Sequence, residues 1–444
     1  MNIRHILSKK NSCWEEGDVE LTKQYEDTLE LTGESKQEFL GFGGCFNEIS
    51  WDILKKLPTE KQDKFFDELY GKDGCAFNMG RVTMGANDYS LEWYSCNETK
   101  NDFEMKNFNI DRDKKYTIPY IKEAQKRCPD LYMFASPWSP PTWMKTKQVY
   151  NNGRIKMQDE ILKAYALYYI KFVQAYKQEG ISIDQIHIQN EPMADQKFPS
   201  CLWHGEDMRD FIKDYIGPEL SKSGLDTELW VGTINGPFSD FMLPGLSSPF
   251  EEFYDQFANT ILSDKEARKY IDGVGFQWGG KHVIEQVELS YPEIKLMQTE
   301  NECGDGENTW QHAEYVFGLI WHYLHHGAER YAYWNMVLPK GGCSTWGWKQ
   351  NSLATIDEET LELTYQPEFY FVKHFSHFVK KGAKILKTKG HWTSNSVAFE
   401  NPDGEVVIVV ASNMNNEREF TFKYREKSFS TIIEPHTIHT FTIK

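Results

Sequence analysis

This sequence of 444 residues has no long apolar run, no paired cysteine motif and no excess of basic charge. No apolar stretch approaches 18 residues, which excludes a transmembrane helix. The formal net charge of −17 argues against nucleic acid, whose phosphates require a basic surface, and against anionic membranes. The first 20 residues lack the apolar segment of a secretory signal. We therefore expect a cytoplasmic protein, unless a signal has been removed from a secreted one.

The eight cysteines are scattered, without a C-x-x-C pair or the spacing of a zinc site. Free thiols are the expectation, and one disulfide is the alternative. His322, His325 and His326 could suggest a metal, but their helical segment should cover a barrel far from the strand ends. We expect neither a metal nor a cofactor.

Segments typical of strands and helices alternate over roughly 300 residues. Strands are predicted at 39–46, 76–84, 131–135, 184–189, 228–233, 274–278, 295–299 and 330–334, and helices at 59–69, 118–127, 158–178, 206–216, 249–262 and 309–326. Eight such repeats indicate a (β/α)₈ TIM barrel. A doubly wound open sheet is the alternative, but Gly41-Phe42-Gly43-Gly44 does not match its phosphate-binding turn, and no helix is expected directly afterwards.

The pattern changes after about residue 378. Segments 396–399, 405–411, 419–423 and 436–443 alternate apolar and polar residues, and Asn401-Pro402-Asp403-Gly404 is typical of a hairpin turn. These features predict a small antiparallel β-sandwich, to which the N-terminal segment 28–32 could add a strand. We expect a barrel domain at 36–377 and a sandwich domain formed by 1–35 and 378–444.

Two glutamates stand at the ends of predicted barrel strands. Glu191 follows a buried strand and precedes Pro192, which cannot continue a central strand. Glu300 directly follows the strand predicted at 295–299. The fourth and seventh strands lie on opposite sides of a barrel mouth, where catalytic groups collect. Paired carboxylic acids across such a gap are what glycosidic bond cleavage requires.

Each assignment has an alternative. A single glutamate at a strand end is commonly a salt-bridge partner in a loop. Glu302 competes with Glu300, although it already lies in the loop. Cys303 could act as a nucleophile, but no histidine at a neighbouring strand end offers a convincing base.

Aromatic residues make up 15% of the chain, including 14 tryptophans. Several follow predicted strands and could present flat apolar faces to a ligand with C–H faces and hydroxyls, such as a sugar. They are Trp138, Trp143, Trp203, Trp278, Trp334, Trp346 and Trp348. The alternative is that they fill the core, which we expect for Trp51, Trp230 and Trp321.

From about Gly41 to the C-terminus the chain resembles glycoside hydrolase family 30, which includes lysosomal glucosylceramidase and microbial β-1,6-glucanases. The matching segments are GFGGCFNE (41–48), RVTMGANDYS (81–90), ASPWSPPTWMKT (135–146), QNEP (189–192), PSCLWHGEDMRDFI (199–212), QTENECGDG (298–306) and YWNM (333–336). ASPWSPPTWMKT and QNEP together are highly specific.

The resemblance implies a TIM barrel with a flanking β-sandwich and a retaining double displacement. It implies that Glu191 is the acid/base and Glu300 the nucleophile, with Arg81 near the nucleophile. It also implies that Asp88, Trp138, Asn190 and Trp334 hold a glucosyl unit. Trp278 and His204, and Trp346 from the loop after the last strand, complete the candidate substrate-binding residues. A packed surface loop is the alternative for Trp346.

One departure from the family pattern follows the sixth strand. Glucosylceramidase has His-Trp-Tyr there, whereas this chain has Gln277-Trp278-Gly279, so a tyrosine near the nucleophile is missing. Together with the segments GANDYS and TENECGDG, this difference makes the chain more similar to the β-1,6-glucanase branch of the family than to the lysosomal enzyme. We therefore expect a retaining β-glycosidase of β-glucosyl linkages, with β-1,6-linked glucan or gluco-oligosaccharides as leading substrates. The alternatives are a glucosylceramidase, a β-glucosidase or β-xylosidase, and a non-catalytic carbohydrate-binding protein.

Overall fold

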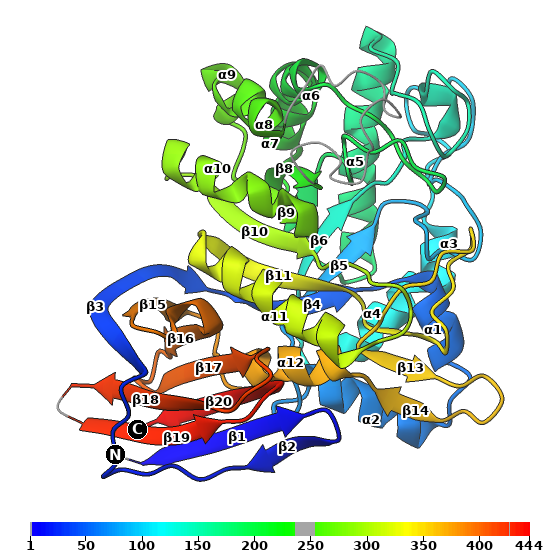
Figure 1. The fold of residues 1–444 in the computed structure, drawn as a ribbon. Helices are drawn as coiled ribbons and strands as arrows, with labels where there is room; N and C mark the ends of the chain where they lie inside the picture. Colours follow the sequence, from blue (N-terminus) through cyan, green and yellow to red (C-terminus); the bar gives the residue numbers. More distant parts are fainter. Residues whose placement is uncertain (1, 236–253, 426) are drawn as a thin grey trace, which may run out of the picture.

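The computed structural model describes residues 2–235, 254–425 and 427–444. Its larger part is a closed barrel of parallel strands in the order β10-β11-β4-β5-β6-β7-β8-β9 (Figure 1). The strands are β4 (Gly41–Cys45), β5 (Met79–Thr83), β6 (Tyr132–Ser136), β7 (Gln185–His187), β8 (Glu228–Ile234), β9 (Gly273–Gln277), β10 (Lys295–Glu300) and β11 (Ala328–Asn335). All eight overlap predicted strands. The TIM barrel is confirmed, and the closed ring excludes the open doubly wound sheet.

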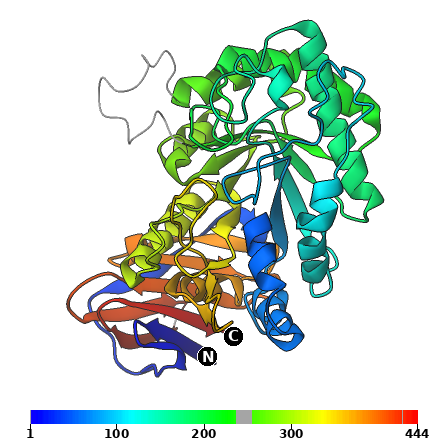
Figure 2. The same cartoon turned by 90° about the vertical axis from the view of Figure 1, so that its right-hand side faces the viewer.

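Figure 2 shows helices arranged around these strands. They are α1 (Glu48–Leu54), α2 (Thr59–Tyr70), α3 (Asp111–Lys115), α4 (Thr117–Gln125), α5 (Asp159–Gln178), α6 (Gly205–Phe211), α7 (Gly217–Ser223), α8 (Tyr254–Leu262), α9 (Lys265–Arg268), α10 (Ile284–Ser290), α11 (Trp310–His325) and α12 (Pro367–Ser376). On α5, Tyr165, Tyr169, Phe172 and Tyr176 recur every three or four residues and are all buried. This apolar face packs α5 onto the barrel.

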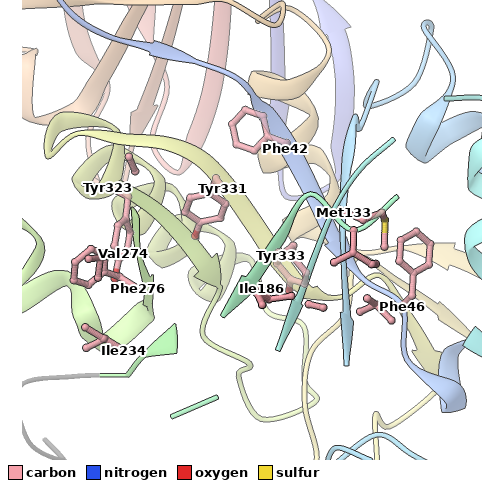
Figure 3. Close-up of a cluster of buried hydrophobic side chains, with 14 of the residues drawn as sticks. Phe42, Phe46, Met133, Ile186, Ile234, Val274, Phe276, Tyr323, Tyr331 and Tyr333 are labelled. Atoms are coloured by element: carbon pink, nitrogen blue, oxygen red, sulfur yellow. The ribbon is translucent and has the colours of Figure 1, made fainter. Parts of the chain in front are cut away.

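Hydrophobic side chains fill both sides of the barrel wall. Figure 3 shows one buried cluster, which includes Phe46, Met133 and Ile186. Inside the barrel, a second cluster contains Phe134 and Trp230. The interior is therefore a packed core, and only the ends of the strands can carry a ligand site.

Two expectations about helices are wrong. A helix does follow the first barrel strand, since α1 begins at Glu48 shortly after β4 ends. It was not expected because its seven residues are too few to show a clear helical period. The helix predicted at 206–216 does not end there, since a π-helical turn (Ile212–Ile216) joins α6 to α7. Pro218 cannot donate the next helical hydrogen bond, and the wider turn accommodates this loss. Of the helix predicted at 249–262, residues 249–253 lie outside the described residues.

The chain ends combine in a nine-stranded sheet, ordered β19-β18-β3-β15-β16-β17-β20-β1-β2, that forms the β-sandwich. Its strands are β1 (Ile3–Lys9), β2 (Ser12–Glu16), β3 (Thr28–Phe39), β15 (Ala383–Lys389), β16 (Ser396–Glu400), β17 (Val406–Ser412), β18 (Arg418–Tyr424), β19 (Lys427–Ile433) and β20 (Thr437–Ile443). The expected N-terminal strand is present as β3, between β18 and β15. β1, β2, β15 and β19 were not predicted. A separate small sheet contains β12 (Val337–Pro339), β13 (Ala354–Ile356) and β14 (Leu363–Tyr365).

Three buried histidines join the sandwich to α12. His5 Nε2 lies 2.8 Å from His439 Nδ1, and the ring nitrogens of His374 lie 2.9 Å from Ser8 Oγ and Thr440 Oγ1. Burial lowers the pKa of His5 to about 4 and that of His374 to about 3, and it holds the pKa of His439 well below its usual value. The three rings are therefore neutral in the folded protein at neutral pH.

Acid is expected to destabilise the fold through these histidines. In the unfolded chain they bind protons below about pH 6.5, whereas the folded protein resists this down to about pH 4, so their contribution falls as pH drops between these values. At pH 5 each of these histidines lowers the free energy of unfolding by about 2 kcal/mol relative to neutral pH. Buried Asp113 and Glu368, whose pKa values burial raises to about 7 and about 8, act in the opposite direction. The test therefore measures the free energy of unfolding at pH 7 and at pH 5 for the parent and for His374→Gln. Between these two pH values the variant should lose about 2 kcal/mol less than the parent. Equal losses in the two proteins would contradict the prediction.

Candidate active site

Arg81, on β5, is the fully buried cation at the centre of the barrel mouth. Its guanidinium donates to Glu300 Oε2 at the end of β10, to Asn190 Oδ1 (2.8 Å) and to Ser136 Oγ (2.9 Å) at the end of β6. Burial raises the pKa of Glu300, and the charge of Arg81 opposes this rise. Arg81 therefore binds residues from three other segments of the mouth and favours the ionised form of Glu300.

Gln277, the last residue of β9, also contacts Glu300. Its Nε2 donates to Glu300 Oε2 (2.9 Å), to Asn190 Oδ1 (2.7 Å) and to Thr233 Oγ1 (3.1 Å). Asn190 Oδ1 thus accepts from both Arg81 and Gln277, so its NH₂ group is the part of the amide left for a ligand. This glutamine begins the segment at which the chain differs from the glucosylceramidase pattern, and it donates a hydrogen bond to the predicted nucleophile.

Glu191 lies beyond β7 in a segment that still pairs with β8, since its main-chain N–H donates to the carbonyl of Thr233 (3.1 Å). Its φ of 46° is in the left-handed region, which is uncommon for residues other than glycine and recurs at functional sites. Its side chain accepts a long hydrogen bond from Gln196 Nε2 (3.4 Å). Burial raises the pKa of Glu191, and the negative charges of Glu300 and Asp88 raise it further. Glu191 therefore favours its protonated form, whereas at Glu300 the bonded guanidinium of Arg81 opposes protonation.

Asp88 is buried in the loop after β5 and accepts from Gln350 Nε2 (3.2 Å). Burial, and then the charge of Glu300, raise its pKa to about 7. Its main-chain carbonyl accepts from the N–H (3.3 Å) and Oγ1 (3.0 Å) of Thr345. Asp88 is thus electrostatically linked to both glutamates and fixed to the loop at 340–350.

Trp138 and Trp334 form an aromatic wall against this cluster. Their rings are stacked with centroids 5.3 Å apart, and Arg81 Cζ lies 4.5 Å from the centroid of Trp138. Both indoles are almost fully buried. They shield the ion pair of Arg81 and Glu300 from water and strengthen it.

The structure separates the other predicted aromatic residues into two groups. Trp143 and Trp203 belong to the main core, where their Nε1 atoms donate to Asn97 O (3.0 Å) and Gln189 Oε1 (3.4 Å). Trp278 is half-buried just after β9, and Trp346 is half-buried in the loop at 340–350. His204 is half-buried and precedes α6. Trp143 and Trp203 thus pack like core residues.

The rival assignments find less support in the geometry. Arg81 pairs with Glu300, the last residue of β10, whereas Glu302 lies beyond the strand. Burial and the charge of Glu300 raise the pKa of the Cys303 thiol well above its usual value, which opposes a nucleophilic thiolate. His322 and His325 bond through ring nitrogens to the carbonyls of Lys281 (2.8 Å) and Trp321 (2.7 Å).

Three properties concern the wider molecule. Over residues 2–235, 254–425 and 427–444, no three His, Cys, Asp or Glu side chains are grouped so that they could hold a metal ion. In the same ranges, no helix has the length and apolar character needed to cross a membrane. All eight cysteines are free.

Residues that the sequence did not single out complete the cluster. Thr233, Ser136, Gln196 and Gln350 each bond to a predicted site residue. Thr233 and Ser136 are polar residues at or near the ends of predicted strands, which is a signal that could have identified them. Gln196 and Gln350 lie in long loops, where the sequence gives no comparable signal.

Known proteins share both parts of this architecture. The glycosyl hydrolase family 30 TIM-barrel domain matches residues 39–379, and the family's β-sandwich domain matches residues 382–441. The lysosomal acid glucosylceramidase of Mus musculus is 29% identical over 93% of this chain and 82% of its own length. An endo-1,6-β-D-glucanase of Neurospora crassa is 25% identical over 86% of this chain and 80% of its own length.

Among solved structures, the endo-β1,6-glucanase BT3312 superposes with a TM-score of 0.87 at 24% identity, covering 99% of this chain and 98% of that protein. This likeness shows a shared fold. The two domain matches together cover the barrel and the C-terminal strands of the sandwich, and the barrel match alone covers more than half of the chain. The chain therefore belongs to glycosyl hydrolase family 30 and is a glycoside hydrolase.

Proposed function

We propose that the protein is a retaining β-glycosidase in which Glu300 is the nucleophile and Glu191 the acid/base. The observation that supports these roles is the unequal environment of the two carboxyl groups. Glu300 accepts hydrogen bonds from Arg81 and Gln277, which favour a carboxylate, whereas Glu191 has one long hydrogen bond and faces two negative charges. Environments that separate two carboxyl groups in this way assign the acid and the nucleophile.

The proposed reaction has two steps. Glu300 attacks the anomeric carbon and forms a glycosyl ester, while Glu191 gives its proton to the oxygen of the leaving sugar. Glu191, now a carboxylate, then takes a proton from water, whose oxygen attacks the same carbon and releases Glu300. Asn190 would donate its NH₂ group to the 2-hydroxyl, and Asp88 would accept from another hydroxyl of the glucosyl unit.

We propose β-1,6-linked gluco-oligosaccharides as the leading substrates. Gln277, which bonds to the proposed nucleophile, supports this choice because it begins the Gln-Trp-Gly segment that replaces the His-Trp-Tyr of glucosylceramidase. Glucosylceramide is the second candidate, favoured by the 29% identity to the lysosomal acid glucosylceramidase. Purified protein should be offered a β-1,6-linked glucotriose, glucosylceramide in micelles, aryl β-glucoside and aryl β-xyloside, with products separated by chromatography. Turnover of the ceramide without any cleavage of a β-1,6 linkage would replace the leading substrate by the second.

Activity is expected to follow a bell-shaped pH profile. It falls at low pH as Glu300 becomes protonated and at high pH as Glu191 loses its proton, and both limits lie above those of ordinary glutamates because both pKa values are raised. Glu191→Gln should abolish the alkaline limb of kcat/KM for an aryl β-glucoside with a good leaving group. It should lower activity toward alkyl β-glucosides far more, by about 10²- to 10⁴-fold. An unchanged alkaline limb in this variant would reassign the acid.

A further inference from the structure

Three aromatic residues outside the enclosed site form what we call the aromatic shelf: Phe198, Trp346 and Trp348. The indoles of Trp346 and Trp348 are stacked with centroids 5.4 Å apart and 20° between their planes. The ring of Phe198 lies 5.5 Å from Trp346. Trp348 is 48% exposed, and it is the one aromatic residue among the described large hydrophobic side chains that are exposed. Since an exposed indole contributes little to the core, its open face is available to a ligand.

The shelf is fixed relative to the predicted pocket. Trp346 and Trp348 stand on the loop at 340–350, which is held to Asp88 through Thr345 and Gln350. Within the loop, the N–H of Ser344 donates to Trp348 O (2.7 Å), and the N–H of Trp348 donates to Ser344 Oγ (3.1 Å). These bonds fix the main chain of Trp348, and stacking on Trp346 places its indole before any ligand arrives, which lowers the entropy cost of binding.

The third member indicates which part of a substrate the shelf would meet. Phe198 belongs to the segment after β7 that also carries Glu191 and Gln196, and it packs against the cluster of Trp138 and Trp334. The proposed acid must lie beside the leaving oxygen, because it protonates that atom. An aromatic surface that extends outward from the acid's own loop therefore adjoins the leaving sugar, whereas Trp138 and Trp334 enclose the sugar whose bond to the nucleophile forms.

We propose that the aromatic shelf binds the β-linked glucose unit on the leaving side of the scissile bond. This inference rests on the proposed function. A β-glucopyranose has equatorial hydroxyls and therefore an apolar C–H face, which stacks on a flat indole. The shelf would favour oligosaccharides over simple glucosides in the first step, and in the second it would hold an acceptor sugar in the place of water.

The test compares a substrate that reaches the shelf with one that does not. For the parent protein, Trp348→Ala and Trp348→Phe, kcat/KM is measured for β-1,6-linked glucotriose and for β-glucosyl fluoride, which has no leaving sugar. Trp348→Ala should lower kcat/KM for the trisaccharide about tenfold more than for the fluoride, consistent with the worth of one aromatic stacking contact. Trp348→Phe should recover most of this loss. Leu289→Ala, which removes a side chain that is 75% exposed on α10, is the control.

A second measurement uses the other half of the reaction. With β-glucosyl fluoride as donor and β-1,6-linked glucobiose as acceptor, Trp348→Ala should lower the ratio of transfer to hydrolysis about tenfold. Equal losses for trisaccharide and fluoride, together with an unchanged transfer ratio, would overturn the shelf. A parent protein that fails to turn over the fluoride would overturn the proposed function instead, so the two failures are distinguishable.

Discussion

Replacement of Glu300 by glutamine is expected to lower kcat for β-glucosyl fluoride by about 10⁴-fold or more, the scale seen when an essential catalytic group is removed. Glutamine has the same shape, and its amide oxygen can still accept from Arg81 and Gln277. The fold should therefore persist while the group that bonds the anomeric carbon is lost. Circular dichroism and the thermal midpoint verify the fold, and initial rates measure the loss.

Glu302→Gln is the matched control for Glu300→Gln, because the two positions are separated by one residue and Glu302 lies beyond the strand. Its kcat should stay within a few-fold of the parent. A severe loss at Glu302 combined with a mild one at Glu300 would exchange their roles. A parent that binds sugars without turnover, with affinity unchanged in Glu300→Gln, would identify a carbohydrate-binding protein.

The smaller variant Glu300→Gly reports the stereochemistry. Azide can enter the space left by the carboxylate and attack the face of the sugar opposite the leaving group, which yields the α-glucosyl azide. Recovery of turnover with that product would support the covalent mechanism. Rescue with the β-anomer instead would place residue 300 on the leaving-group side.

Replacing Arg81 by methionine is expected to cost about 3–5 kcal/mol of unfolding free energy, because it leaves the charge of Glu300 buried without its cation. Arg81 also donates to Asn190 and Ser136, so three acceptors lose a partner together. The pKa of Glu300 should rise further, which moves the acidic limb of the pH profile toward higher pH. Chemical denaturation and kcat/KM against pH measure the two effects.

Arg209→Met is the control for Arg81→Met, since the ion pair of Arg209 with Asp210 (2.9 Å) is partly exposed and should contribute no more than about 1 kcal/mol. The double variant Arg81→Met with Glu300→Gln should recover part of the lost stability, because it removes the uncompensated charge. This coupling distinguishes the ion pair from packing around Arg81. Additive losses in the double variant would argue against the ion-pair account.

The barrel and its two glutamates were predictable because each depends on local sequence. The barrel strands are short apolar segments, and Glu191 and Glu300 are the polar residues that follow two of them. The hydrogen bonds of Gln277 and Thr233 to Asn190 were not predictable, since they form only when β7, β8 and β9 close at one register. The cluster of His5, His374 and His439 combines the two ends of the chain, which no local pattern connects.

Strand β19 shows a different limit of sequence reasoning. Its segment follows β18 through a short connection and pairs with it from end to end, yet it was not predicted. The α1 helix was missed because it is short, and the continuation of α6 into α7 because Pro218 looks like a stop. For β19, the pairing with β18 outweighs the local preference.

The position of β1 has a consequence for how the protein is made. β1 pairs with β20 along its whole length, and the main chains of Asn2 and Lys444 exchange hydrogen bonds beside it. β1 leaves the ribosome long before β20 is synthesised, so the edge of β1 that pairs with β20 stays unpaired until β20 emerges. The barrel between them can close during this time, and the sandwich is completed only after synthesis reaches β20. A nascent chain arrested before β20 would therefore display an open edge that chaperones or other unfinished copies could capture.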